Sequence, residues 1–351
     1  MYKPLYDITQ CALYKVQSKA RLAALLHVSV PALKGMSQSR KYREFTLEEE
    51  ICPFTGKKTK SRDVQAPAEA LRPIHERIHD LLRRCAPPAY AHAAIKKRSY
   101  RTNAEAHKTG RVVATFDLNS FYPSTSESTV FRFFAEQMLC AHDIAGLLAR
   151  LVCVERKGTF PCLPTGSPLS PLISIYANKP MFDDLAQLAG EHALTFTCYV
   201  DDLTFSGRAI PSGIEDMVTS IARRYGHNLS THKSKKFGTH AAKHITGVVI
   251  LNGRVTVPNS RFHKARKIQM AINAEPDPQK KIALMEKLAG LIGEAAYLDP
   301  RYRSLMDRTR QALSNFRMNM PSTTVSLLPE TLEAARRAGF DLADGASGLG
   351  D

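Results

Sequence analysis

Two adjacent carboxylates interrupt a strand-like run in the second half of the chain. Residues 198–206 read CYVDDLTFS, and Asp201 and Asp202 are surrounded by the β-branched, aromatic and apolar residues that strands favour. Asp is depleted inside strands, and a buried carboxylate without a partner is costly. Two explanations are open at this point: the pair lies in a solvent-exposed hairpin turn, where Asp is common, or positive charge lies against it.

A third carboxylate is placed where it could join this pair. Residues 112–116 form a β-branched and aromatic run that predicts a strand, and the strand ends at Asp117. Alone, Asp117 is more simply interpreted as a strand-end cap, but if the two strands are neighbours, three carboxylates meet at one edge of a sheet. Such a cluster needs cations, and its hard oxygen atoms suit Mg²⁺. Two ions roughly 3.5–4 Å apart could activate a 3′-hydroxyl and stabilise a leaving pyrophosphate in an in-line displacement.

The charge of the chain points to a polyanionic partner. Its 351 residues include 49 Lys and Arg against 33 Asp and Glu, a net charge of +16, while the apolar share of 44% is that of a globular protein. Residues 217–274 contain eleven Lys or Arg and no acid, and in residues 96–111 Glu105 is the only acid. Two basic tracts therefore flank the carboxylates, as expected of a site that contacts nucleic-acid phosphates.

The cysteines and the termini indicate the compartment. The seven cysteines form no CxxC pair and no Cys/His cluster with zinc spacing, so reduced thiols are expected. The N-terminus has no charged segment followed by an apolar stretch, and no run of 18 apolar residues occurs in the chain. We therefore expect a cytoplasmic protein that has no membrane partner.

The helices and strands that must position the carboxylates are predicted from the spacing of apolar residues and from the Ser and Pro residues at helix ends and in loops. Ser18 and Ser29 predict the starts of two short helices, the second with Pro31 in its first turn. Further helices are expected at residues 69–84, 130–149 and 214–225, and a Pro/Gly/Ser-rich loop at residues 161–171 opens a long helix. Short strands are expected at residues 245–250 and 254–257, helices over residues 261–316 with breaks at 276–278 and at 300, and a last helix at 329–338.

Three segments in series resemble the A, B and C motifs of reverse transcriptases. They are FDLNSFYPS at residues 116–124, LPTGSPLSP at 163–171 and YVDD at 199–202. NAEAH at residues 103–107 resembles the NAxxH motif of bacterial retron reverse transcriptases, and ITG at 245–247 resembles their VTG motif with Ile for Val. The resemblance extends from about residue 18 to residue 316, and the length without appended domains is also similar to that of a retron enzyme.

The resemblance implies an α+β right-hand polymerase with helical fingers, an antiparallel-sheet palm and a basic α-helical thumb. The expected boundaries are residues 1–111 for the N-terminal helices and fingers, and 112–257 for the palm with an interleaved fingers segment at about 128–190. The thumb is expected at residues 258–318 and a C-terminal tail at 319–351.

The same resemblance implies roles for individual residues. Asp117, Asp201 and Asp202 would be the catalytic carboxylates that bind two Mg²⁺ ions. The residues implied to bind the nucleotide are Arg62, Tyr122, Thr165, Gly166 and Lys233, with Thr165 at a position where most relatives have Gln. Tyr122 would lie under the sugar and exclude a 2′-hydroxyl. RNA contact is expected from Asn103, His107, Thr246, Gly247, Arg261, Lys264, Arg266 and Lys267, with support of the fingers as an alternative role for Asn103 and His107.

The function implied is that of an RNA-directed DNA polymerase that copies a cognate structured non-coding RNA into single-stranded DNA with dNTPs. Resemblance to retron enzymes implies priming from a 2′-hydroxyl of that RNA, a branched RNA–DNA product, and antiphage defence together with an effector protein encoded nearby. Two alternatives stay open: a stand-alone reverse transcriptase of the group II intron or abortive-infection kind, and a nucleic-acid-binding scaffold that holds a toxin effector inactive.

Overall fold

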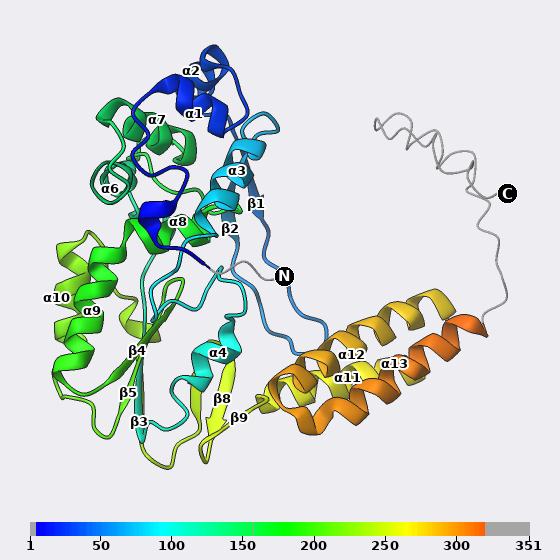
Figure 1. Ribbon diagram of the computed structural model, residues 1–351. Coiled ribbons are helices and arrows are strands. Elements are labelled where there is room, and N and C mark those ends of the chain that lie inside the picture. Colours follow the sequence, from blue (N-terminus) through cyan, green and yellow to red (C-terminus); the bar gives the residue numbers. More distant parts are fainter. Residues whose placement is uncertain (1–4, 157, 320–351) are drawn as a thin grey trace, which may run out of the picture.

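The computed structural model describes residues 5–156 and 158–319, and it confirms the expected α+β class with antiparallel sheets. In Figure 1 a four-stranded sheet lies below a group of helices from the first half of the chain, and three long C-terminal helices project to the right. Within the described ranges, no helix is both long and apolar enough to cross a membrane. The helix expected at residues 329–338 lies outside the described residues.

The central sheet has the strand order β4-β5-β3-β6, and every pairing is antiparallel. Its strands are β3 (Val112–Asp117), β4 (Thr195–Tyr199), β5 (Asp202–Gly207) and β6 (Lys235–Phe237). Phe116, Phe196 and Phe205 share one core with helices α9 (Lys179–Glu191) and α10 (Ile214–Arg224). Because successive strand residues point to opposite faces, the neighbours of these aromatic residues lie on the face away from α9 and α10.

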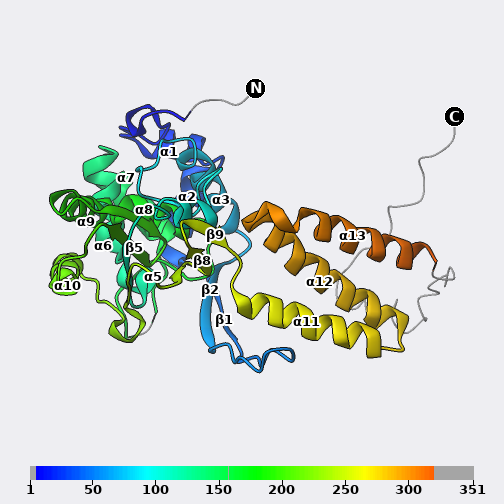
Figure 2. The same ribbon diagram turned by 90° about the horizontal axis from the view of Figure 1, so that it is seen from below.

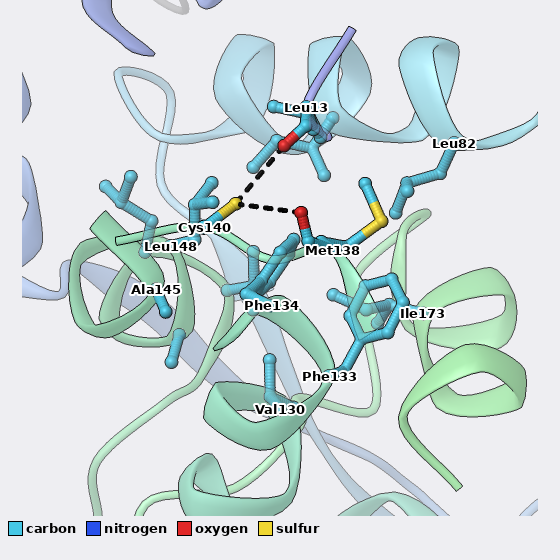
Figure 3. Packing of buried hydrophobic residues seen from close by; sticks show 14 of the residues in the cluster. Leu13, Leu82, Val130, Phe133, Phe134, Met138, Cys140, Ala145, Leu148 and Ile173 are labelled. Atoms are coloured by element: carbon cyan, nitrogen blue, oxygen red, sulfur yellow. Dashed lines mark hydrogen bonds between the residues drawn. The ribbon is translucent and has the colours of Figure 1, made fainter. Parts of the chain in front are cut away.

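The helices of the first half of the chain enclose a second core (Figure 3). These are α1 (Lys19–Leu25), α2 (Val30–Ser39), α3 (Arg72–Leu82), α6 (Glu127–Arg132), α7 (His142–Val152) and α8 (Ser170–Ala177). The predicted caps are confirmed, because the Ser18 and Ser29 hydroxyls accept backbone N–H groups of Arg21 and Ala32 at 3.2 and 3.3 Å. Asn178 separates α8 from α9, so the long helix predicted after the loop at residues 161–171 is two helices.

The single helix predicted at residues 130–149 was wrong. α6 runs into a π-helical turn at Phe133–Gln137, and the chain then breaks before α7, with Leu139 at φ 50°. The break admits a segment from near the N-terminus: Lys15 N donates to Met138 O at 2.8 Å, and the Cys140 thiol contacts Leu13 O at 3.2 Å (Figure 3). A contact between segments so far apart in the chain leaves no trace in local periodicity.

A smaller sheet carries the ITG segment and corrects the strand predicted at residues 245–250. The order is β7 (Lys243–Ile245), β8 (Val248–Leu251) and β9 (Arg254–Thr256). Thr246 at φ 45° and Gly247 at φ 79° form a two-residue turn of the kind that closes tight hairpins, so the predicted strand is two antiparallel strands. Helix α4 (Tyr100–Glu105) packs on this sheet through a common core that also includes Val113 of β3.

The C-terminal helices are α11 (Asn259–Ala274), α12 (Pro278–Leu298) and α13 (Arg303–Met318), and the two predicted breaks are confirmed. The long hairpin of β1 (Tyr42–Leu47) and β2 (Arg62–Pro67) reaches across to them (Figure 2). Phe54, near its tip, packs against the core that α11 forms with α12.

Candidate active site

Asp201 lies in a hairpin turn, as one of the two explanations held, and Asp202 is the first residue of the strand that follows. Tyr199 of β4 pairs with Asp202 of β5, and Val200 and Asp201 form the two-residue turn between them. Val200 has φ 58°, a conformation that costs a β-branched residue on the order of 1–3 kcal/mol. Leu118 N donates to Asp201 O at 2.9 Å and so ties the turn to the chain that follows β3. The turn is half-buried rather than solvent-exposed.

Asp117 lies directly across from the turn. β3 and β5 are neighbours, and Asp117 is the register partner of Asp202. Since Phe116 and Leu203 belong to the core under α9 and α10, Asp117 and Asp202 lie on the opposite face of the sheet. The three carboxylates expected to converge therefore lie at one end of the β3–β5 pair.

The site has more negative charge than its surroundings neutralise. The pKa of the Asp202 carboxyl is raised to about 7 by burial and then by the charges of Asp201 and Asp117. Burial also raises the pKa of Asp201, which the charges of Lys233 and Arg62 partly offset. The Lys233 ammonium donates to both carboxylate oxygens of Asp117, at 2.7 and 2.8 Å. Lys233 and Arg62, two of the residues expected to bind nucleotide, thus lie within electrostatic reach of the carboxylates.

The donor set fits a hard divalent cation. Carboxylate oxygens are the ligands that Mg²⁺ prefers, and burial with mutual repulsion favours any cation that joins them. In the conformation described for residues 5–156 and 158–319, no three His, Cys, Asp or Glu side chains are already arranged as metal ligands. Lys233 stands against Asp117 instead, where its ammonium supplies the positive charge.

The loop before α8 is fastened to β2, and this brings Thr165 and Gly166 close to the strand that begins at Arg62. Gly166 N donates to Gln65 O at 3.0 Å, and the Thr165 hydroxyl lies 3.0 Å from Asp63 O. A Cβ at position 166 would lie 2.5 Å from Val64 Cγ1, so the approach requires glycine.

Tyr122 lies on a short helical turn, α5 (Phe121–Ser124), that follows Asp117. Burial raises the pKa of its phenol, and the charges of Asp201 and Tyr199 raise it further. The Tyr122 hydroxyl is therefore within electrostatic reach of the turn that carries Asp201. Phe121 points into the core under α9, as its apolar ring predicts.

The residues expected to contact RNA fall into two groups. Asn103 and His107 are completely buried, so in this structure neither presents a surface to RNA. His107 bridges the Ser206 and Thr197 hydroxyls of the central sheet, both at 2.7 Å, and Asn103 Nδ2 lies 3.4 Å from Thr246 Oγ1. The alternative role of support is the one these contacts favour, and what they support is the central sheet and the β7–β8 turn.

The second group lies at the surface near the C-terminal helices. Arg261 pairs with Glu294 and donates to Gly247 O at 3.3 Å, so part of its charge is neutralised within the protein. On α11, Arg266 and Lys267 are exposed, and Lys264 is half-buried. These side chains give α11 a basic edge beside the tip of the β1–β2 hairpin. Gly247, in the β7–β8 turn, is also exposed.

A cleft of about 1440 Å³ opens beside Tyr199 of the β4–β5 hairpin. It runs between the chain before α4, the C-terminal end of α3 and the segment around Tyr6. Its lining includes four cationic and four aromatic side chains: Arg83, Arg84, Lys96, Arg98, Tyr6, Tyr100, Tyr176 and Tyr199. This mixture of cations and aromatic rings suits a nucleic-acid strand.

Sequence reasoning missed several polar residues that hold the site together. His75 Nδ1 and Ser167 Oγ share a hydrogen bond of 2.7 Å in the loop before α8. Thr125, Asn178 and His227 form a buried group behind α5. No local signal in the sequence distinguishes them from ordinary core residues, because their partners are 49 to 92 residues away along the chain.

This fold and this site are those of a nucleic-acid polymerase, and comparison with known proteins agrees. Residues 55–250, more than half of the chain, match the family model described as Reverse transcriptase (RNA-dependent DNA polymerase). The chain therefore belongs to the reverse transcriptase family, which acts on a nucleic-acid template with dNTPs and generally uses divalent metal ions.

Individual relatives are retron enzymes. The chain is 28% identical to the Retron Se72 reverse transcriptase of Salmonella heidelberg over 280 residues, which are 75% of this chain and 68% of that protein. It is 27% identical to the Retron Mx65 reverse transcriptase of Myxococcus xanthus over 328 residues, 88% and 75% of the two chains. Identity to the Retron Ec86 reverse transcriptase of Escherichia coli is 23% over 229 residues, 64% and 68% of the two chains. The predicted resemblance to retron reverse transcriptases is confirmed.

Proposed function

We propose that this reverse transcriptase copies a cognate structured non-coding RNA into single-stranded DNA, starting from a 2′-hydroxyl of that RNA, so that the product is branched RNA–DNA. The observation that carries the synthetic part is the pairing of Asp117 with Asp202 beside the Asp201 turn. Similarity to retron reverse transcriptases over most of the chain supports the branched product. Antiphage defence with a separately encoded effector is part of the same proposal.

The three carboxylates would hold two Mg²⁺ ions, which supply charge neutralisation and a more acidic attacking hydroxyl when bound. Lys233, paired with Asp117 in this structure, would then turn towards the triphosphate and stabilise the leaving group. Arg62, at the exposed start of β2, would bind phosphate oxygens through its planar guanidinium. Lys233 and Arg62 would thus both place positive charge against the phosphates of the bound nucleotide.

The remaining nucleotide contacts would shape the pocket. Tyr122 would lie under the sugar, since its turn follows Asp117 and its hydroxyl is near Asp201. Thr165 and Gly166 would line the new base pair from the loop fastened to β2. This arrangement requires little motion of the loop, because β2 already holds it.

The chain divides, in this proposal, like a right hand. The β1–β2 hairpin and the helices of the first half would be the fingers, the four-stranded sheet the palm and α11–α13 the thumb. The thumb would grip the duplex mainly through backbone phosphates, with Lys264, Arg266 and Lys267 on its basic edge. The cleft beside Tyr199 would take the strands leaving or entering the catalytic centre.

The proposal is tested by purifying the protein from its native locus and analysing the bound nucleic acid. We expect DNA that stays joined to RNA through phenol extraction until a debranching enzyme is added, and that is absent from Asp201→Asn. Asp216→Asn, an exposed acid on α10, is the matched control and should keep the product.

Other outcomes select the alternatives. DNA that is free of RNA would indicate a stand-alone reverse transcriptase. RNA alone, together with dNTP incorporation that Asp201→Asn leaves unchanged, would refute the catalytic assignment. An effector that co-purifies equally with wild type and Asp201→Asn would favour the scaffold.

A further inference from the structure

Three buried polar side chains form a continuous group between the segments that carry the catalytic residues. Thr125 follows α5, Asn178 separates α8 from α9, and His227 follows α10. None of the three is more than 2% exposed. Burial of so much polar surface is costly unless it is hydrogen-bonded, so the contacts among the three side chains matter; His227 Nδ1 is buried without a partner.

The hydrogen bonds define one arrangement. The Asn178 amide donates both hydrogens, to Thr125 Oγ1 and to Ser174 O, each at 2.9 Å. Its Oδ1 therefore faces His227, whose Nε2 donates to it at 2.8 Å. The Thr125 hydroxyl in turn donates to Phe121 O at 2.9 Å. The orientation of the Asn178 amide is therefore fixed, because turning it over would place its oxygen against the Ser174 carbonyl oxygen, and neither atom can donate a hydrogen bond.

The end of this chain of hydrogen bonds is the turn that carries Tyr122. α5 has four residues, too few to be a stable helix alone, and it starts from Ser120 at φ 49° with no side-chain cap. Its stability must come from contacts with the rest of the chain, and these include the hydrogen bond from Asn178 to the Thr125 hydroxyl and the Phe121 ring, 5.3 Å from the His227 ring. The group thus determines where α5 ends and how Tyr122 is oriented.

The segment that carries His227 also bonds to the strand end that carries Asp117. Asn119 N donates to Asn228 O, and Ser230 N donates to Asp117 O, both at 2.8 Å. Lys233, three residues beyond Ser230, pairs with the Asp117 carboxylate. His227 is therefore the point at which the polar group joins the segment leading to the active-site lysine.

We infer that Thr125, Asn178 and His227 are positioning residues that hold α5 so that Tyr122 discriminates dNTPs from rNTPs. They touch neither substrate nor metal and act through Tyr122. The inference rests on the proposed function, in which Tyr122 lies under the sugar, and it adds the group that keeps the tyrosine there. Loss of one hydrogen bond lets α5 shift and admits a 2′-hydroxyl.

The test compares dUTP with UTP, which differ only at the 2′ position, on an RNA template with a DNA primer, using the full-length protein. Thr125→Val keeps the side-chain shape and removes the hydroxyl, and we expect the ratio of kcat/KM for dUTP over UTP to fall about tenfold. Thr125→Ser restores the hydroxyl and should recover most of the ratio. His227→Phe keeps a ring against Phe121 and removes the bond to Asn178, and it should lower the ratio as well.

A matched control separates positioning from loss of stability. Val130→Ala removes buried methyl groups from the core of the first-half helices (Figure 3) and leaves the hydrogen bonds of the polar group in place. It should lower Tm by an amount similar to Thr125→Val and leave the dUTP/UTP ratio unchanged. A similar fall of the ratio in Val130→Ala would overturn the inference.

A second comparison separates this inference from the proposed function. Tyr122→Ala should abolish the discrimination. If it does, and both Thr125→Val and His227→Phe keep the wild-type ratio, the three residues do not position Tyr122 although the proposed site stands. If Tyr122→Ala itself keeps the wild-type ratio, the proposed role of Tyr122 is wrong and the inference fails with it.

Discussion

Replacing Gly166 by Ala adds one methyl group at the contact between the loop before α8 and β2. The new Cβ would lie 2.5 Å from Val64 Cγ1, 2.9 Å from Gln65 O and 3.1 Å from Gln65 C. Ordinary contacts between carbon atoms are about 3.5–4.0 Å, so the loop and the strand must separate by roughly 1 Å. Gln65 O is backbone, which cannot move without the strand that begins at Arg62.

Overpacking of this kind costs about 1–3 kcal/mol. A free-energy difference of about 1.4 kcal/mol is a factor of ten in an equilibrium. If the cost falls on the conformation that binds nucleotide, the KM for dNTPs should rise about 5- to 150-fold, with a smaller change in kcat, because the carboxylates lie on other strands.

Steady-state incorporation on an RNA template measures the effect, and urea denaturation measures stability beside it. The control is Gly190→Ala on α9, where an added Cβ meets no atom within 4 Å and where Ala should stabilise the helix by about 0.5–1 kcal/mol. Wild-type KM and stability in Gly166→Ala would show that the close approach of loop and strand is not needed.

Three further predictions concern charge. Lys233→Met should lower the single-turnover incorporation rate about 100-fold while urea stability changes little, since the lysine is half exposed; an unchanged rate would contradict its role at the leaving group. Burial lowers the pKa of His107 to about 3, so the unfolded chain binds a proton first: the contribution of His107 to stability should be constant above about pH 6.5 and about 2 kcal/mol smaller at pH 5. Urea titrations of His107→Gln should show a weaker fall, and an identical profile would refute the assignment. The double variant Arg266→Ala/Lys267→Ala should reduce the slope of log K against log salt for RNA binding by about 2, whereas Arg223→Ala/Arg224→Ala on α10 should not.

Much of the scaffold could be predicted because its determinants are local. Ser18 and Ser29 cap helices wherever they precede helical periodicity, and Pro278 and Pro300 break helices because proline lacks an N–H. The strand at residues 112–117 and the hairpin at Asp201 follow from residue types within a few positions. Such patterns need no knowledge of the rest of the chain.

Two of the mispredicted elements, the helix at residues 130–149 and the strand at 245–250, are decided by distant contacts. The chain opens after α6 to receive residues 13–16, and their hydrogen bonds to residues 138–141 replace helical ones. The strand expected at residues 245–250 turns back at Thr246, where α4 packs against the small sheet. In both cases burial of a partner segment outweighs local propensity.

The amino-acid sequence by itself determined the chemistry: the order of three aspartates, the basic charge around them and the motifs of a reverse transcriptase. Only the tertiary structure decided which side chains meet. Asn103 and His107, which from the motif alone could contact RNA, are buried against the central sheet, while Thr125, Asn178 and His227 gather behind Tyr122. The physical reason is that the hydrogen-bond partners of these buried side chains lie far along the chain, and only folding brings them within hydrogen-bonding distance.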